Sequence, residues 1–201
     1  MNQIPLPAGM PVLRTARLEV RPLHHGDLAV CHRLYNDIGW SDPTLSDPEN
    51  LALRRSWLTW SVANERELAR LHQPPLGDRA VVDAASGEFI GLVGLVPALA
   101  PFGLLPSFGG DPQARQSLEM GLFWAVSPGR QRTGVATEAA LGLIDHAFGA
   151  LRLARIVATT EHDNHASIGV MRRLGMTLER NPLPEPAHFQ TVGRLDAEAR
   201  S

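Results

Sequence analysis

The stretch from Phe123 to Glu138 has residue types and spacing that are suited to binding an anion. An apolar strand pattern ends there, and a glycine leads directly into a helical pattern. At such a turn successive backbone N–H groups point outward, and the helix dipole adds partial positive charge. Gly134 and Ala136 keep side chains away so that a pyrophosphate can approach the backbone, and Arg130 and Arg132 add guanidinium groups that bind phosphate. A tight turn packed with small residues explains the same pattern, so this stretch alone does not identify a site.

The composition excludes several other chemistries. All 19 basic residues other than histidine are arginines. A Schiff-base lysine, a lysine general base and a Walker-type phosphate loop are therefore excluded. The three-glycine dinucleotide fingerprint is also missing, which argues against a nucleotide-binding protein that takes ATP or NAD. The net charge of −2 argues against binding to nucleic acid or to an anionic membrane through bulk charge.

Sulfur and imidazole groups give little sign of a metal site or of disulfides. Cys31 is the single cysteine, so no internal disulfide is expected, and its helical context favours a buried apolar role. His162 and His165 have no evident third ligand, so we expect no metal. The N-terminus does not resemble a signal peptide, and a cytoplasmic location is expected.

The elements that would position this candidate phosphate-binding turn alternate between strands and helices. The apolar stretch Phe89 to Pro106 approaches the length of a membrane span, but its prolines and glycines favour a buried strand to Val96 and then an irregular loop. Two strand–helix–strand crossovers predict an α/β sheet with helices on its faces. The expected strands are Arg17–Leu23, Arg79–Ala84, Glu88–Val96, Ser117–Val126, Arg155–Thr160, Met176–Arg180 and Phe189–Leu195, and the expected helices are Leu28–Tyr35, about Glu49–Leu71, Ala136–Phe148 and Asn164–Leu174.

Three segments together resemble the GNAT N-acetyltransferase superfamily. Gln131-x-x-Gly134-x-Ala136 is similar to its coenzyme A loop. The segment Thr159 to Met176 resembles the N-x-x-S…LG[FM] pattern of the RimJ/RimL-type branch, and Thr15 to Pro22 resembles the first strand of that branch. The resemblance covers about residues 13–195.

The resemblance implies a mixed, mostly antiparallel sheet of six to seven strands, flanked by about four helices and splayed at the central strands. We expect one domain over residues 1–201, with an arm at 1–12, a core at about 13–195 and a tail at 196–201.

The resemblance also implies direct transfer of an acetyl group from acetyl-CoA to a primary amine, with no metal. Backbone groups at the end of the strand before the loop would pair with the pantetheine arm, and one N–H would polarise the thioester carbonyl. The residues expected to bind the coenzyme are Trp124, Ala125, Val126, Arg130, Gln131, Arg132, Thr133, Gly134, Val135, Ala136, Thr137 and Asn164.

Glu119, on the strand leading to the loop, is the candidate base, and a solvent-facing edge carboxylate is the alternative. In many relatives the corresponding glutamate lies two residues nearer the proline, where this chain has Gly121. Glu161 and Asp163 are fallback bases. The tyrosine that superfamily members often carry on the last helix is replaced by Met171, which leaves Ser167 as the candidate acid or as a first-turn residue bonded to backbone.

The expected partner is an amine acceptor, either a small molecule or a protein N-terminus, and the chain is expected to be a monomer or a homodimer. Trp40 and Phe108 are candidates to line the acceptor cleft, and Glu138 is expected to be structural. The alternative to an enzyme is a non-catalytic module of the same fold that binds and senses acyl-CoA.

Overall fold

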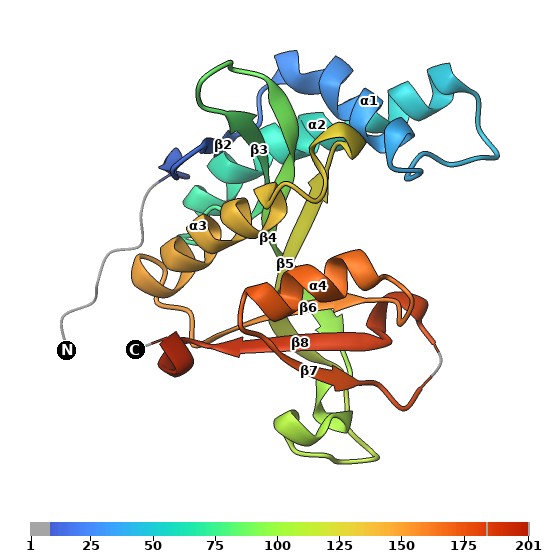
Figure 1. Cartoon of the computed structure of the whole chain (residues 1–201), viewed down its shortest axis with the longest axis vertical. Coiled ribbons are helices and arrows are strands. Elements are labelled where there is room, and N and C mark those ends of the chain that lie inside the picture. Colours follow the sequence, from blue (N-terminus) through green and yellow to red (C-terminus); the bar gives the residue numbers. More distant parts are fainter. Residues whose placement is uncertain (1–8, 184, 201) are drawn as a thin grey trace. The chain divides into compact units, whose positions relative to one another are not determined.

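The computed structural model describes residues 9–183 and 185–200. Figure 1 shows its strands and helices. The strands are β1 (Leu13–Arg14), β2 (Leu18–Pro22), β3 (Gly77–Asp83), β4 (Phe89–Ala100), β5 (Ser117–Val126), β6 (Arg155–Thr160), β7 (Thr177–Arg180) and β8 (Thr191–Asp196). The α-helices are α1 (Leu28–Asp37), α2 (Asp47–Arg70), α3 (Val135–Gly149) and α4 (His165–Arg173).

The chain divides into two compact units. The first contains the residues up to Gly94 together with Trp124–His146, and the second contains Leu95–Phe123 together with the residues from Ala147 onward. β4, β5 and α3 each pass from one unit to the other.

The strand order β1-β2-β3-β4-β5-β6-β8-β7 confirms the expected mixed, mostly antiparallel sheet. β2 pairs antiparallel with β3 through Val20 and Val81, and β6 pairs antiparallel with β8 through Ala158 and Gly193. β5 runs parallel to β6, and their register contains the single pair Gly121 and Val157. A ladder of one pair is consistent with the predicted splay. The described strands number eight, one more than the upper expectation, because the two-residue β1 gave no pattern to detect.

β4 is longer than predicted, because it continues through Pro97 to Ala100 instead of ending at Val96. Gly94 lies against Gly77, the first residue of β3, so the later part of β4 extends past that neighbour. A proline is tolerated in a strand where no neighbour needs its missing N–H donor. Among the described residues no helix is long and apolar enough to span a membrane.

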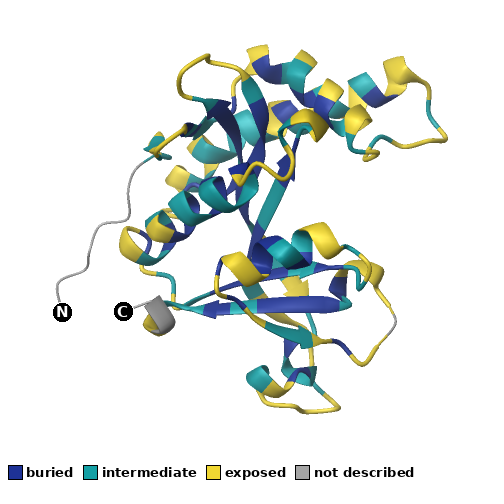
Figure 2. Cartoon of the chain, viewed as in Figure 1, coloured by how far each residue is buried: buried dark blue, intermediate teal, exposed yellow. Residues whose placement is uncertain are grey.

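In the first unit, buried residues lie along β3, β4 and one side of α3, as Figure 2 shows. On α3, Ala140, Leu143 and Ile144 are fully buried. On α2, Leu53 and Trp60 are 54% and 58% exposed, whereas Leu58 is buried. Apolar residues occur on several sides of this helix, so helical spacing does not select the buried side.

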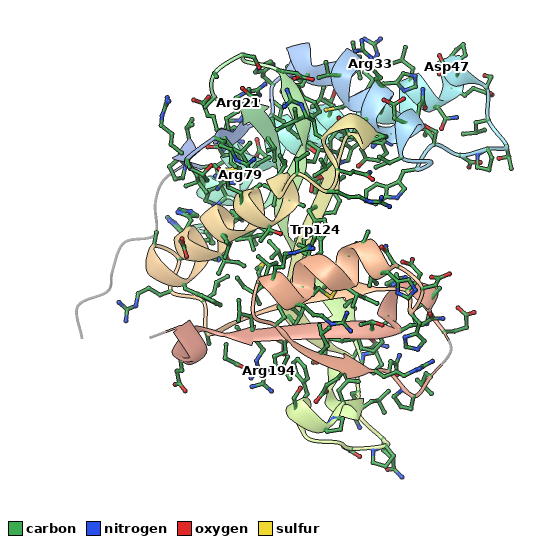
Figure 3. All side chains as sticks on the ribbon, viewed as in Figure 1. Arg21, Arg33, Asp47, Arg79, Trp124 and Arg194 are labelled. Carbon is green, nitrogen blue, oxygen red and sulfur yellow. The ribbon has the colours of Figure 1, made fainter. Side chains whose placement is uncertain are left out.

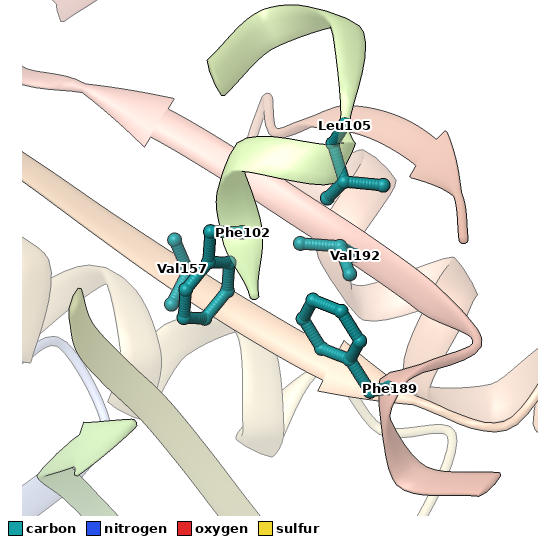
Figure 4. Packing of buried hydrophobic residues seen from close by; sticks show 5 residues of the cluster. All are labelled: Phe102, Leu105, Val157, Phe189 and Val192. Carbon is teal, nitrogen blue, oxygen red and sulfur yellow. The ribbon is translucent and has the colours of Figure 1, made fainter. Parts of the chain in front are cut away.

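In the second unit, the segment between β4 and β5 contributes to a hydrophobic core. Phe102 and Leu105 are buried against Val157, Phe189 and Val192 (Figure 4). The rings of Phe102 and Phe189 meet edge to face with centroids 5.2 Å apart. The irregular loop expected after Val96 therefore contains two short 3₁₀ turns, Phe102–Leu104 and Pro106–Phe108, which contribute to this core.

Candidate functional site

The predicted phosphate loop forms a cradle of unpaired backbone donors. After the 3₁₀ turn Pro128–Arg130, Arg132 and Gly134 both adopt left-handed backbone conformations, with φ of 61° and 84°. No backbone N–H from Arg132 to Thr137 makes a well-formed hydrogen bond within the described chain, and the first helical bond is donated by Glu138 to the Gly134 carbonyl. Donors turned outward at a helix N-terminus are the chemistry that a pyrophosphate requires, so these residues fit a nucleotide coenzyme.

Two side chains of the loop stabilise the turn itself. The Gln131 Nε2 donates to the Val126 carbonyl at 3.0 Å, and the Thr133 hydroxyl donates to the Arg130 carbonyl at 2.6 Å. Both residues are predicted from the sequence to bind coenzyme, and the structure shows that their side chains close the turn. Val135 is buried, so it contributes its backbone rather than its side chain to the cradle.

The β1–β2 hairpin holds the loop from outside. The Glu138 carboxylate accepts hydrogen bonds from the Thr15 hydroxyl at 2.6 Å, the Arg17 backbone N–H at 2.9 Å and the Arg17 Nε at 2.7 Å. The Arg17 Nη1 donates to the Thr133 carbonyl at 3.2 Å. Partial burial acts to raise the pKa of the Glu138 carboxyl, but the hydrogen bonds and the Arg17 charge together lower it, so this carboxylate is ionised.

Arg130 already has anionic partners. Its guanidinium pairs closely with Glu88 and lies 3.8 Å from an Asp83 oxygen. It also lines a pocket of about 560 Å³ in the first unit. Arg132 is exposed, and no ion pair of its side chain is found within the described residues. The pocket is lined by Val30, Arg33, Leu34, Asp37, Glu88, Phe89, Ser127, Pro128, Gly129 and Arg130.

The end of β5 offers backbone groups away from β4. The Ser127 N–H donates to the Ile90 carbonyl at 2.9 Å, so strand alternation turns the N–H and C=O groups of Trp124 and Val126 to the opposite edge. The Val126 carbonyl accepts a hydrogen bond from the Gln131 side chain. Trp124, which Figure 3 labels, is half-buried. Ala125, between them, points its backbone toward Gly91 on β4. This edge can pair with an extended arm of a ligand.

Glu119 is neither free nor an edge carboxylate in solvent. It is 18% exposed, and one of its oxygens lies 3.2 Å from the Arg155 Nη1. Arg155 also donates to Asp196 at 3.0 Å, and Asp196 in turn pairs with Arg194. Both guanidinium groups lie 4.9 Å from the centroid of the Phe108 ring. The Phe108 ring therefore lies close to two arginines within the second unit.

Asn164 and Ser167 lie at the start of α4. The Asn164 Oδ1 accepts the Ser167 backbone N–H at 3.0 Å, so Asn164 is an N-cap. The Ser167 hydroxyl makes no hydrogen bond to another described residue, which differs from the expected backbone contact and leaves a free donor. Met171 is fully buried, so the position where relatives carry a tyrosine belongs to the core here.

Glu161 and His162 each have a hydrogen-bond partner in the second unit. A hydrogen bond from the backbone N–H of Glu161 to its own carboxylate lowers the pKa of that carboxyl, so Glu161 is a weaker base. His162 lies 2.9 Å from the Thr191 hydroxyl through its Nδ1. Among residues 9–183 and 185–200, no three metal-ligating side chains gather in a group.

A half-buried carboxyl that the sequence did not reveal, Asp78, lies at the start of β3. The Trp57 Nε1 donates to the Asp78 carboxyl at 3.2 Å, and the Cβ of any residue replacing Gly94 would lie 2.8 Å from an Asp78 oxygen. Arg54 lies nearby, with its guanidinium 3.1 Å from the Tyr35 ring centroid and 5.0 Å from that of Trp57. Burial raises the pKa of Asp78 to about 6. A single aspartate before a strand carries no sequence signal for such a shift.

Replacing Asp78 with asparagine is expected to stabilise the protein at pH 8 but not near pH 4. The pKa of about 6 in the folded state exceeds the ordinary value of 3.8. Stability therefore falls as pH rises from about 4 to 6, because only the unfolded chain readily loses this proton. The asparagine side chain would avoid that loss and keep an acceptor for Trp57, a gain of about 1–3 kcal/mol at pH 8. Urea unfolding of both proteins at pH 4.5 and pH 8 measures it, and an equal offset at the two pH values would contradict the expectation.

Comparison with known proteins gives a consistent picture. The family model described as "Acetyltransferase (GNAT) domain" matches residues 17–177. Spermidine N(1)-acetyltransferase of Escherichia coli K12 is 27% identical over 165 residues, which are 81% of this chain and 74% of that protein. N-acetyltransferase YnaD of Bacillus subtilis is 38% identical over 56 residues, which are 28% of this chain and only 33% of that protein.

Solved structures agree in fold. The acetyltransferase of Agrobacterium tumefaciens C58 is 26% identical and has a TM-score of 0.63, and the match covers 92% of this chain and 94% of that one. RimL ribosomal L7/L12 alpha-N-protein acetyltransferase, solved in complex with coenzyme A, has a TM-score of 0.59 at 16% identity, with 92% and 96% of the two chains covered. Relatives named for spermidine and for protein N-termini both match, so the comparisons do not single out a RimJ/RimL-type branch.

Proposed function

Since the chain belongs to the acetyltransferase (GNAT) family, we propose that it transfers an acetyl group directly from acetyl-CoA to a primary amine. The observation that carries this proposal is the row of unpaired backbone N–H groups from Arg132 to Thr137 at the N-terminus of α3. We assign this row to the pyrophosphate of the coenzyme. The Trp124 backbone is assigned to the pantetheine arm, because it faces away from β4.

The remaining groups have roles that follow from their chemistry. The bound coenzyme supplies an acetyl thioester, whose C–S bond breaks as the new C–N bond forms. Glu119 accepts a proton from the acceptor ammonium, directly or through water, which frees the nitrogen lone pair to attack the carbonyl carbon, and the free Ser167 hydroxyl donates a proton to the leaving thiolate. Asn164 caps α4 and so orients Ser167. A backbone N–H at the end of β5 polarises the acetyl carbonyl.

We propose that the acceptor is a small-molecule amine or a protein N-terminus. Relatives are named for each of these, namely a spermidine N(1)-acetyltransferase and an L7/L12 alpha-N-protein acetyltransferase. We place the protein in the cytoplasm as a monomer or homodimer.

Two measurements test the proposal. Purified protein is titrated with acetyl-CoA by calorimetry, and release of free coenzyme A is then followed with spermidine, other small amines and N-terminal peptides. Binding followed by acceptor-dependent release supports the proposal. If acetyl-CoA does not bind, the assignment of the cradle is wrong. If it binds and none of these acceptors stimulates release, the result favours the alternative of a non-catalytic module that senses acyl-CoA.

A further inference from the structure

We infer that Arg17, Thr15 and Glu138 are positioning residues that hold the phosphate loop in its coenzyme-binding shape. This inference rests on the proposed function, because it assigns the loop to the pyrophosphate of coenzyme A. The three residues lie in the first unit and connect the β1–β2 hairpin to the first turn of α3.

The contacts fix the loop at two points. Glu138 accepts from the Thr15 hydroxyl and twice from Arg17, and a salt bridge of 2.6 Å joins it to the Arg17 Nη2. The other end of the same guanidinium donates to the Thr133 carbonyl. Because Thr133 precedes the left-handed Gly134, Arg17 ties the middle of the loop to the helix that follows it. A planar guanidinium can make these contacts together, and a lysine ammonium cannot reach both points.

The surrounding residues leave room for this arrangement. A Cβ at Gly134 would lie 3.4 Å from the Arg17 Nη2, and a Cβ at Gly142 would lie 3.1 Å from the Thr15 Cγ2. Small residues at both positions therefore allow the hairpin to approach α3 closely. The Arg17 side chain remains 53% exposed, so its contacts are made at the surface rather than in the core.

The charges of Arg17 and Glu138 have a second consequence for coenzyme binding. Glu138 is an anion in the first turn of the helix whose N-terminus is assigned to an anionic pyrophosphate. Without a nearby cation it would repel that ligand. Arg17 neutralises it while shaping the loop. Loss of Arg17 therefore removes a support and also exposes a repulsive charge, whereas loss of the Glu138 charge removes the support alone.

This asymmetry predicts an order of coenzyme affinities. Arg17→Gln is expected to weaken coenzyme A binding about 30-fold and Glu138→Gln about fivefold, in line with the loss of charge-assisted hydrogen bonds. The double variant Arg17→Gln/Glu138→Gln is expected to bind better than Arg17→Gln alone, because the unpaired carboxylate is gone. Arg17→Lys restores the charge but not both contacts, so it is expected to recover part of the affinity.

The experiment measures dissociation constants for coenzyme A and for pantetheine, which lacks the pyrophosphate. Arg14→Gln on the same hairpin is the matched control, since Arg14 forms only an exposed pair with Glu19 and is 75% exposed itself. A positioning role predicts that Arg17→Gln has lower affinity for coenzyme A and unchanged affinity for pantetheine, whereas Arg14→Gln keeps both affinities and its melting temperature. Equal losses for both ligands in Arg17→Gln would mean general damage to the fold and would overturn the inference.

The two proposals fail in different ways. If wild-type protein does not bind coenzyme A, the proposed function is contradicted. If wild-type protein binds it and Arg17→Gln binds equally well, only the positioning role is contradicted. A double variant that binds worse than Arg17→Gln would overturn the electrostatic part of the inference.

Discussion

Gly91→Ala is expected to lower the free energy of unfolding by about 3–5 kcal/mol, a large share of the stability of a domain of this size. A Cβ at Gly91 would lie 2.2 Å from the Ala125 carbonyl oxygen and 3.2 Å from the Val126 Cα. Both neighbours are backbone atoms of β5, so no side chain can rotate away. Relief requires β4 and β5 to separate locally, which strains the hydrogen bond from Ser127 to Ile90.

Chemical denaturation of the variant and the wild type measures this loss. Gly149→Ala is the matched control, because nothing lies within 4 Å of its added Cβ and it is a helical position. That control is expected to be neutral or to gain up to about 1 kcal/mol. Equal midpoints for Gly91→Ala and wild type would show that the strands can move apart freely. The displaced β5 backbone is also expected to weaken coenzyme A binding.

The elements with strong local signals were predictable from the sequence. β5 and β6 have the predicted bounds, and α3 begins and ends one residue outside its predicted range. In these segments apolar periodicity and flanking glycine or proline agree with the tertiary contacts. The end of β4 was not predictable, because whether Pro97 breaks a strand depends on where the neighbouring β3 begins. That information comes from a residue far away in the sequence.

The candidate site likewise has a part that could be predicted from the sequence and a part that could not. The backbone cradle follows from a short local motif, and its left-handed Arg132 and Gly134 fit the expected turn. The partner of Glu138 could not be predicted, since Arg17 and Glu138 are separated by 121 residues. The absence of lysine is consistent with how this site is built. The cradle consists of backbone N–H groups, and the side chain that braces it is an arginine whose fork makes several contacts at once.

Glu119→Gln is expected to lower kcat by about 100-fold or more while leaving the affinity for acetyl-CoA within about twofold. The amide keeps the size of the carboxylate and an acceptor for Arg155, which lies 3.2 Å away, but it cannot take a proton from the acceptor amine. Steady-state kinetics with the best acceptor from the panel, combined with calorimetric titration of acetyl-CoA, separate the two quantities. Matching melting temperatures show that the fold is intact.

The network around Glu119 offers the competing explanation, namely that the carboxylate only anchors Arg155 and so Phe108. Arg155→Gln separates the two, because it removes the same ion pair and keeps the carboxylate. If Glu119 is the base, kcat falls far more in Glu119→Gln than in Arg155→Gln. If the pair is purely structural, the two variants lose similar activity and similar stability, and the assignment of Glu119 as the base is wrong. In that case the remaining candidates, Glu161 and Asp163, carry the proton.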